Sequence, residues 1–164
     1  MEIQQNLADR GKRLAAYLID MIPIMLIVFG FFYLFLGLDA TLTEYLNRGT
    51  ELEPRVKFLR ERNWIREISF IVWVIYCIVM ESSERQGTFG KSAMRIKVVD
   101  ENGNRMTLSK SFGRNTSKIL SYLVVFLGFL WILFDKEKQG WHDKINKTFV
   151  VNKNFEIKPV ANKG

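Results

Sequence analysis

The sequence predicts an all-α membrane bundle with a small β element on its cytoplasmic side. Three apolar runs are separated by charged stretches, although the mean hydropathy is near zero, at +0.01. The first run, 14–38, holds one formal charge and exceeds the roughly 20 apolar residues that cross a bilayer. A segment between the second and third runs alternates with a period of two, which is typical of a strand.

Two of the apolar runs are predicted to be transmembrane helices. The run over 14–38 is too long for a signal peptide, and no small-residue cleavage site follows it. The run over 64–80 is expected to continue a charged helix that starts at Pro54, since proline suits a first helical turn. The third run, 119–134, is predicted to be membrane-embedded. It is either a full span or a broken, re-entrant helix bent near Gly128.

The whole chain, 1–164, is expected to form a single membrane domain. Its extramembrane parts are predicted to be a charged loop over 39–63, a cytoplasmic hairpin segment over 81–118 and a cytoplasmic tail over 135–164. No internal repeat is evident in the amino-acid sequence.

The β element is predicted in two places. Met94, Ile96 and Val98 alternate with Arg95, Lys97 and Val99, and Asn102-Gly103 then supplies a turn. Residues 105–108 are expected to form a short return strand. Thr148 to Val151 are predicted to be a third strand that pairs with Arg95 to Val99.

Basic residues set the expected orientation. The N-terminal stretch has three Lys and Arg, the 81–118 segment has eight and the tail has seven, whereas 39–67 has six. Placing the first three segments inside gives eighteen basic residues against six, which the positive-inside rule favours. We therefore expect a multi-pass protein of the plasma (inner) membrane with a cytoplasmic N-terminus.

Several function classes are excluded by composition. One cysteine and one histidine make neither a disulfide nor a usual zinc site, so no metal and no cofactor are expected. The basic residues flank apolar runs instead of forming a stripe, so nucleic acid is not an expected partner. The segment 87–92 resembles part of a P-loop, but the first glycine of that pattern is replaced by Arg85. No enzyme activity is expected.

Asp20 is the most informative residue, because a carboxylate inside a span is costly and usually functional. Arg13 and Tyr17 are expected to share its helical face, with Arg13 as the nearest cation and Tyr17 between them. Arg114 and Lys118 are competing partners. Asp20 either locks helix packing through an ion pair or serves as an ion or proton site.

His142 and Asp143 form the chain's one His-Asp pair. A metal-dependent phosphohydrolase would need further His and Asp ligands, and the chain has no other histidine. Asp143 is therefore expected to cap a turn or to pair with a basic residue.

Taken together, these pieces resemble the RDD family of membrane proteins over nearly the whole length. The resemblance rests on a set of short motifs in a fixed order: Ala8 to Asp20, which includes Arg10; Gly87 to Lys91; Ile96 to Asp100; Asn102-Gly103; Arg114; Gly128 to Trp131; His142 to Lys144; and Thr148 to Val151.

The resemblance implies roles for the arginine and the two aspartates that name the family. These correspond to Arg13, Asp20 and Asp143. Some members resemble cation/proton antiporters, so the resemblance implies transport of a monovalent cation or proton, with Asp20 as the ionisable site. Three apolar runs are few to enclose a path, so the size of the chain predicts a homo-oligomer. The alternative is a membrane interaction or scaffold protein with a basic cytoplasmic face.

Overall fold

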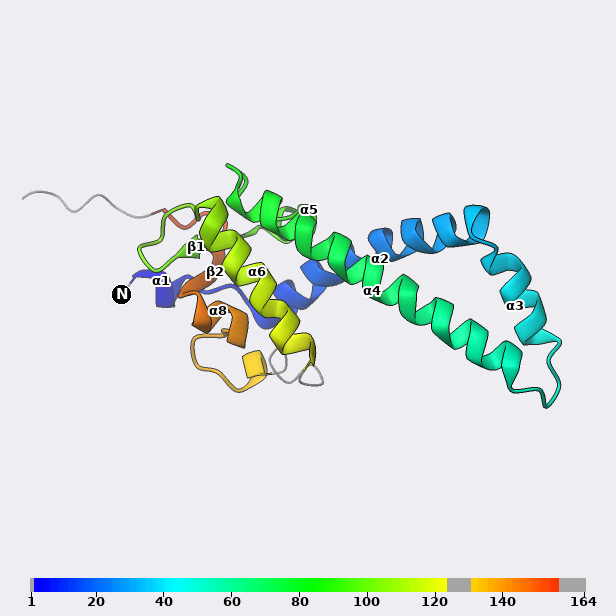
Figure 1. The fold of residues 1–164 in the computed structure, drawn as a ribbon. Helices are drawn as coiled ribbons and strands as arrows, with labels where there is room; N and C mark the ends of the chain where they lie inside the picture. Colours follow the sequence, from blue (N-terminus) through cyan, green and yellow to red (C-terminus); the bar gives the residue numbers. More distant parts are fainter. Residues whose placement is uncertain (1, 124–130, 157–164) are drawn as a thin grey trace, which may run out of the picture. The chain divides into compact units, whose positions relative to one another are not determined.

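The computed structural model describes residues 2–123 and 131–156 (Figure 1). The described chain is mostly helical, with a small antiparallel sheet. In order along the chain its elements are α1 (Glu2–Gln5), α2 (Arg10–Phe35), α3 (Leu38–Leu46), α4 (Glu53–Ser82), α5 (Phe89–Ala93), β1 (Ile96–Asp100), α6 (Leu108–Leu123), the 3-10 helix η1 (Trp131–Leu133), α8 (Trp141–Ile145) and β2 (Thr148–Asn152).

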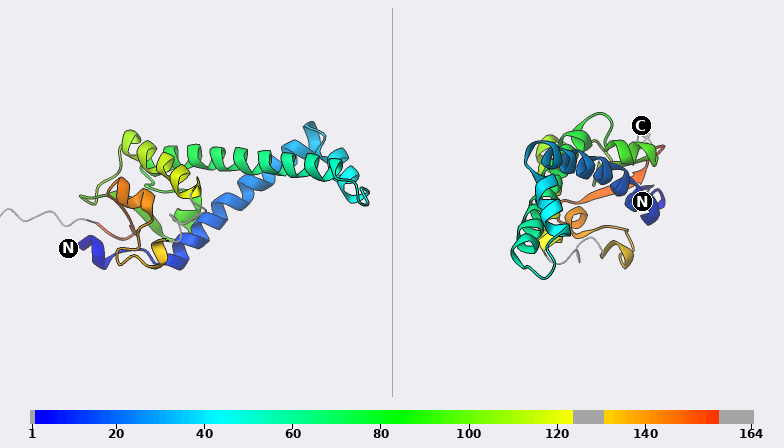
Figure 2. Two further views of the ribbon diagram at one scale, coloured as in Figure 1. Left: turned by 60° about the horizontal axis from the view of Figure 1, so that its bottom comes forward. Right: turned by 90° about the vertical axis from the view of Figure 1, so that its right-hand side faces the viewer.

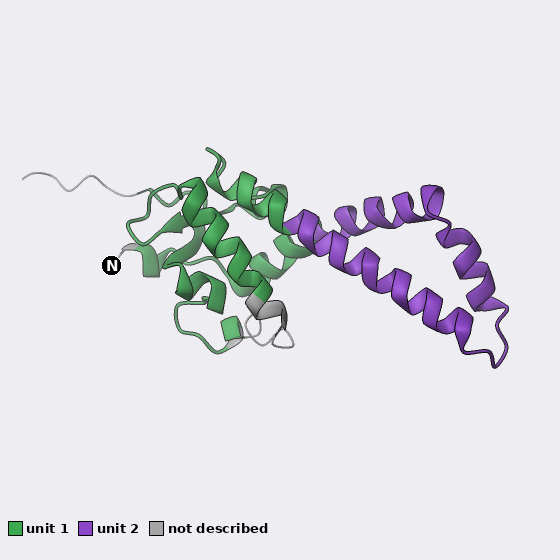
Figure 3. Ribbon diagram, viewed as in Figure 1, with its two compact units in different colours: residues 1–19, 74–164 green, residues 20–73 purple. Residues whose placement is uncertain are grey.

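The chain divides into two compact units (Figure 3). Unit 1 comprises residues 1–19 and 74–164, and unit 2 comprises residues 20–73. The two long helices α2 and α4 each contribute to both units.

Unit 2 is a helical hairpin that α3 closes. Val28 and Phe32 of α2 cluster with Leu38 of α3 and Ile65 of α4. The stretch predicted to be a loop over 39–63 is therefore largely helical, since it contains most of α3 and the first turns of α4. Gly37 ends α2 with a positive φ of 74°, which allows the chain to turn sharply into α3.

Asp9 starts α2, because its Oδ1 accepts a hydrogen bond from the Gly11 N–H at 2.8 Å. Within the described residues, α2 is the one helix long and apolar enough to cross a membrane. The predicted helix from Pro54 through the second run is present as α4. The membrane crossing of 64–80 stays a prediction, and the predicted bend near Gly128 lies outside the described residues.

The sheet in unit 1 pairs β1 with β2 in antiparallel register, with Val98 opposite Val150 (Figure 2). The predicted pairing of Thr148–Val151 with the first strand is thus confirmed. The predicted turn is also present, with Gly103 at a φ of 77°. The prediction of a return strand over 105–108 is wrong. Leu108 already begins α6, and the strand that pairs with β1 is β2.

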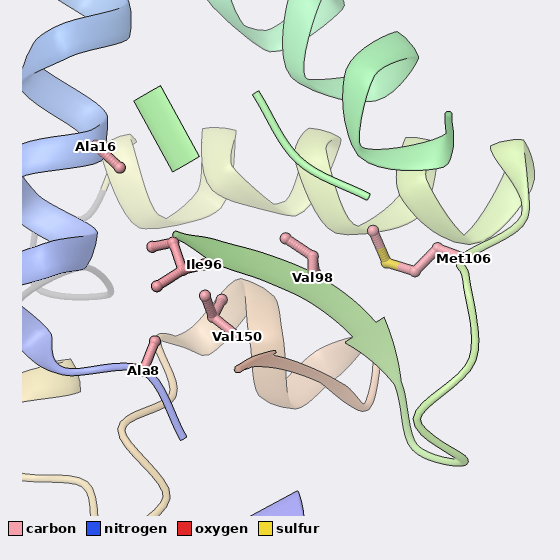
Figure 4. Close-up of a cluster of buried hydrophobic side chains, with 6 residues drawn as sticks. All are labelled: Ala8, Ala16, Ile96, Val98, Met106 and Val150. Atoms are coloured by element: carbon pink, nitrogen blue, oxygen red, sulfur yellow. The ribbon is translucent and has the colours of Figure 1, made fainter. Parts of the chain in front are cut away.

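Small and branched side chains fill the core around one face of this sheet. Figure 4 shows Ile96, Val98 and Val150 meeting residues from the N-terminal segment, α2 and the segment before α6. The full cluster comprises Ala8, Ala16, Ile96, Val98, Met106 and Val150. The other face of the sheet buries Val99 and Val151 against Phe155. A sheet of two strands is thus covered on both sides.

Two short segments of unit 1 form an internal structural repeat that is not evident in the amino-acid sequence. Among the described residues, four non-glycine residues have a positive φ, and they form two pairs, Gln86 with Lys138 and Arg95 with Lys147, each 52 residues apart. The same offset maps α5 onto α8 and β1 onto β2. We call residues 86–100 and 138–152 the two modules.

Hydrogen bonds repeat at the same offset. The Ser92 N–H donates to the Thr88 carbonyl at 2.9 Å, and the Lys144 N–H donates to that of Gly140 at 3.1 Å. Both strands show the same burial pattern. Because an offset of 52 also relates the paired Val98 and Val150, a pseudo-two-fold axis passes between these residues. Side-chain identity is low, which explains why the sequence did not reveal the repeat.

In each module, a residue between the helix and the strand has an energetically unfavourable positive φ. Arg95 and Lys147 adopt φ values of 55° and 48°, which an L-residue with a side chain occupies at about 1 kcal/mol cost. We expect Arg95→Gly to raise the free energy of unfolding by about 1 kcal/mol relative to Arg95→Ala. Lys147→Gly should behave in the same way relative to Lys147→Ala. Thermal unfolding in detergent measures both, and a Gly variant less stable than its Ala partner contradicts the prediction.

A buried ion chain in unit 1

Arg114 of α6 is the centre of a chain of buried charges. Its side chain is 1% exposed, and its guanidinium contacts two carboxylates. One guanidinium nitrogen forms a short ion pair with Glu81 at the end of α4. The other, Nη2, lies 2.5 Å from Oδ1 of Asp143 in α8, while Nε donates to the same oxygen at 3.0 Å. Arg114 therefore joins α4, α6 and α8.

On one side of Arg114, Glu81 is held by α5 and α6. Its Oε1 lies 2.5 Å from Nζ of Lys91, and its Oε2 accepts a hydrogen bond from Asn115 Nδ2 at 2.9 Å. Nζ of Lys118 is 3.8 Å from Oε1. Because the carboxylate is fully buried, these donors replace the water that it loses on folding.

On the other side, Asp143 joins α8 to the start of α2. Its Oδ2 pairs with Arg13, whose Nη1 also donates to the Lys138 carbonyl at 2.5 Å. The same oxygen accepts the Gly140 N–H at 3.1 Å, which caps α8. Asp143 thus both caps a turn and pairs with basic residues, as the sequence predicted. We call Lys91, Glu81, Arg114, Asp143 and Arg13 the ion chain, because their charges alternate in sign.

The pseudo-two-fold axis explains how the ion chain is assembled. Lys91 and Asp143 are 52 residues apart and occupy the same position in α5 and α8. The two modules therefore present one side chain each toward the Arg114–Glu81 pair. The charges at the two positions are opposite, so Lys91 binds Glu81 and Asp143 binds Arg114.

Burial and the charges of the ion chain together shift the pKa values of Asp143 and His142. Burial by itself would raise the pKa of Asp143, but the adjacent Arg13 guanidinium, with that of Arg114, holds this pKa well below its usual range. Burial lowers the pKa of His142 to about 3, against the opposing effect of Asp143. His142 is therefore neutral at pH 7, so its 3.5 Å contact with Asp143 is not an ion pair there.

The structure brings together three of the predicted site residues, Arg13, Arg114 and Asp143, with His142 beside them. Arg10 lies apart from them and donates to the carbonyls of Ile132 and Asp135 at 2.9 and 3.0 Å. Arg13 pairs with Asp143. The predicted pairing of Asp20 with a basic group stays a prediction.

Asp20 and Tyr17 lie outside the ion chain. Asp20 belongs to unit 2 and is 7% exposed, while Tyr17 is half-buried in unit 1. Asp20, Ile24 and Val28 recur every four residues, and Ile24 and Val28 belong to the cluster that includes Ile65 of α4. Asp20 therefore occupies the interior face of α2.

Sequence reasoning missed Glu81, Lys91 and Asn115. Glu81 directly follows an apolar run, and Lys91 lies in a motif that was noted only for its glycines. The clearest available signal was in α6, where polar residues recur with helical spacing at Ser111, Arg114, Asn115 and Lys118. A polar helical face normally meets solvent, and here all four side chains are buried.

No group of three or more His, Cys, Asp or Glu side chains with a geometry suited to a metal ion occurs among residues 2–123 and 131–156. The buried acids face arginine and lysine, so the ion chain neutralises its own carboxylates.

One helix of the described residues, α2, is long and apolar enough to cross a membrane, and it adjoins a compact unit that holds the buried ion chain. The model of the RDD family matches residues 7–147, and the chain belongs to this family, whose members are generally membrane-associated. An uncharacterized protein of Bacillus subtilis (strain 168), YxaI, is 41% identical over 86 residues, which are 52% of this chain. The match spans about half of that relative, at 56% of its length. No solved structure matches the chain.

Arg114 is expected to be essential for the stability of unit 1. Replacing it by Leu leaves Glu81 and Asp143 with fewer partners in a buried site, and breaking such a pair typically costs about 3–5 kcal/mol. Arg66→Leu is the control, because Arg66 pairs with Glu67 on an exposed surface, where a loss of about 1 kcal/mol or less is expected. Chemical or thermal unfolding in detergent compares the variants. Equal losses for the two variants contradict the assignment.

His142 is expected to make stability pH-dependent. Its pKa is 6.5 when exposed and about 3 in the folded protein, so between these values the unfolded chain binds the extra proton. The free energy of unfolding therefore falls as the pH drops from 6.5 toward 3, by up to about 1.4 kcal/mol per pH unit. Melting temperatures from pH 7.5 to 4.5 measure this effect.

His142→Gln should flatten this slope, and His142 is the chain's one histidine. Asp143 contributes a separate loss only near and below its ordinary pKa of 3.8. A variant that retains the full slope above pH 4.5 would show that other groups cause it.

Proposed function

We propose that the protein transports protons or monovalent cations, with Asp20 as the ionisable site within the membrane. One observation carries this proposal: Asp20 is 7% exposed in the most apolar helix of the described chain. An ionised carboxylate in such a place is energetically costly unless it is paired or hydrated, and such residues are usually functional. Pro23, three residues later, leaves a backbone carbonyl of α2 without its usual donor.

Among the described residues, unit 2 buries further polar atoms without a hydrogen-bond partner, on Glu61 and on Ser69. Ser69 of α4 is fully buried, and its Oγ has no hydrogen-bond partner among the described residues. A hydroxyl of this kind is suited to bind a cation or to relay a proton. Because the chain offers few apolar runs to enclose a path, we propose that a homo-oligomer forms it.

The proposed orientation places the N-terminus, 81–118 and the tail in the cytoplasm, at the plasma membrane. The basic residues support this through the positive-inside rule. The repeat gives independent support. Each module follows an apolar run, 64–80 or 119–134, so equivalent modules are suited to runs that end on the same side of the membrane.

The second candidate is a non-enzymatic interaction or scaffold protein. Unit 1 has eighteen Lys and Arg and ten Asp and Glu, a net formal charge of +8, which suits an acidic partner. In this case Asp20 has only a packing role. The two candidates differ in whether Asp20 must exchange a proton or cation.

The test is flux into proteoliposomes loaded with a pH-sensitive dye under an imposed sodium or potassium gradient. Asp20→Asn should abolish flux while the protein remains folded and inserted, and Asp20→Glu should retain part of it. Asp39→Asn is the matched control, because Asp39 is an exposed acid in α3 of the same unit. Wild-type flux by Asp20→Asn, or a loss of stability without any wild-type flux, would favour the interaction protein.

A further inference from the structure

Helix α6 exposes apolar side chains and buries polar ones. Leu108, Phe112 and Ile119 are 61%, 56% and 44% exposed. They recur at helical spacing and form one stripe, which we call the α6 stripe. The polar face holds Arg114 and Lys118 at 1% and 3% exposure. Water favours the reverse arrangement, so the α6 stripe is a candidate for contact with an apolar environment.

The net charge of unit 1 indicates which kind of apolar environment matches the α6 stripe. Unit 1 carries eighteen basic and ten acidic residues, whereas unit 2 carries six and seven. The net charges are therefore +8 and −1. A basic unit is attracted to a leaflet of anionic lipid at about 1 kcal/mol per nearby Lys or Arg.

Aromatic rings beside cations occur elsewhere on unit 1. The rings of Phe89 and Tyr76 stack with their centroids 6.5 Å apart. The Arg85 guanidinium lies 5.0 Å from the centroid of the Phe89 ring. In the second module, Trp141 contacts Trp131 at 6.3 Å, and Lys144 lies 6.0 Å from the Trp131 ring. Phe89 and Trp141 are equivalent, since they begin α5 and α8. Such rings with adjacent cations are typical of the membrane–water interface.

We propose that the α6 stripe lies in the boundary between headgroups and acyl chains of an anionic leaflet. Leu108, Phe112 and Ile119 contact lipid, while the opposite charges of the ion chain are satisfied within the protein behind them. The lipid contact then begins at Leu108, eleven residues before the apolar run at 119. This surface is independent of any transport through Asp20.

Cysteine labelling with an environment-sensitive NBD fluorophore tests the proposal. Phe112→Cys places the label on the stripe, and Ser109→Cys places it on another exposed face of the same helix. Cys77 stays in place, because it is buried, and the unmodified chain gives the background labelling. The full chain is reconstituted in vesicles of phosphatidylglycerol or phosphatidylcholine, with or without doxyl-labelled lipid.

The label at 112 should emit at shorter wavelength and be quenched by doxyl lipid several-fold more than the label at 109, with stronger quenching in phosphatidylglycerol. Equal quenching at the two positions would overturn the proposal, since the label on the stripe would then be no closer to lipid than the label at 109. A label at 112 that doxyl lipid does not quench, but that self-quenches in detergent as well, would also overturn it. That result would show that a second copy of the chain covers the stripe.

Discussion

The ion pair between Arg114 and two carboxylates is the interaction on which unit 1 depends. Glu81 lies in the last turn of a long helix and Asp143 in the first turn of a short one, and neither carboxylate is exposed to solvent. Either one left unpaired would cost several kcal/mol, comparable with the whole stability of a small domain. Residues far apart in the chain must therefore be in place together, from Arg13 to Asp143. The ion chain specifies one arrangement where apolar packing alone would tolerate several.

The burial of charge in turn determines how helix α6 is oriented. Its polar residues are committed to Glu81 and Asp143, so its apolar residues face outward. A soluble domain would gain little from such a helix, because exposed leucine and phenylalanine give up the hydrophobic contribution to folding. In a membrane-associated family the same orientation costs little. The ion chain and the exposed stripe are thus two results of one constraint.

Much of the fold could be predicted from local pattern. The long apolar helix α2, the long helix from Pro54 and the pairing of β1 with β2 follow from hydropathy and period, and the turn at Gly103 follows from its Asn-Gly pair. The site was only partly predictable. Arg13 was assigned to Asp20 because helical spacing shows only neighbours in the same helix, while its partner Asp143 lies 130 residues away. Glu81 and Lys91 are ordinary charged residues in the sequence and become a site only through packing.

The repeat has a consequence for how such a site arises. In a symmetric dimer of identical modules, the residue corresponding to Lys91 and Asp143 would have the same charge in both copies, and the two would repel across the axis. Joining the modules in one chain removes that restriction. Each position can then change independently, and opposite charges can be placed on the two sides of the Arg114–Glu81 pair. Opposite charges at equivalent positions of a nearly symmetric backbone are thus possible when the two modules are joined in one chain, but not in a dimer of identical modules.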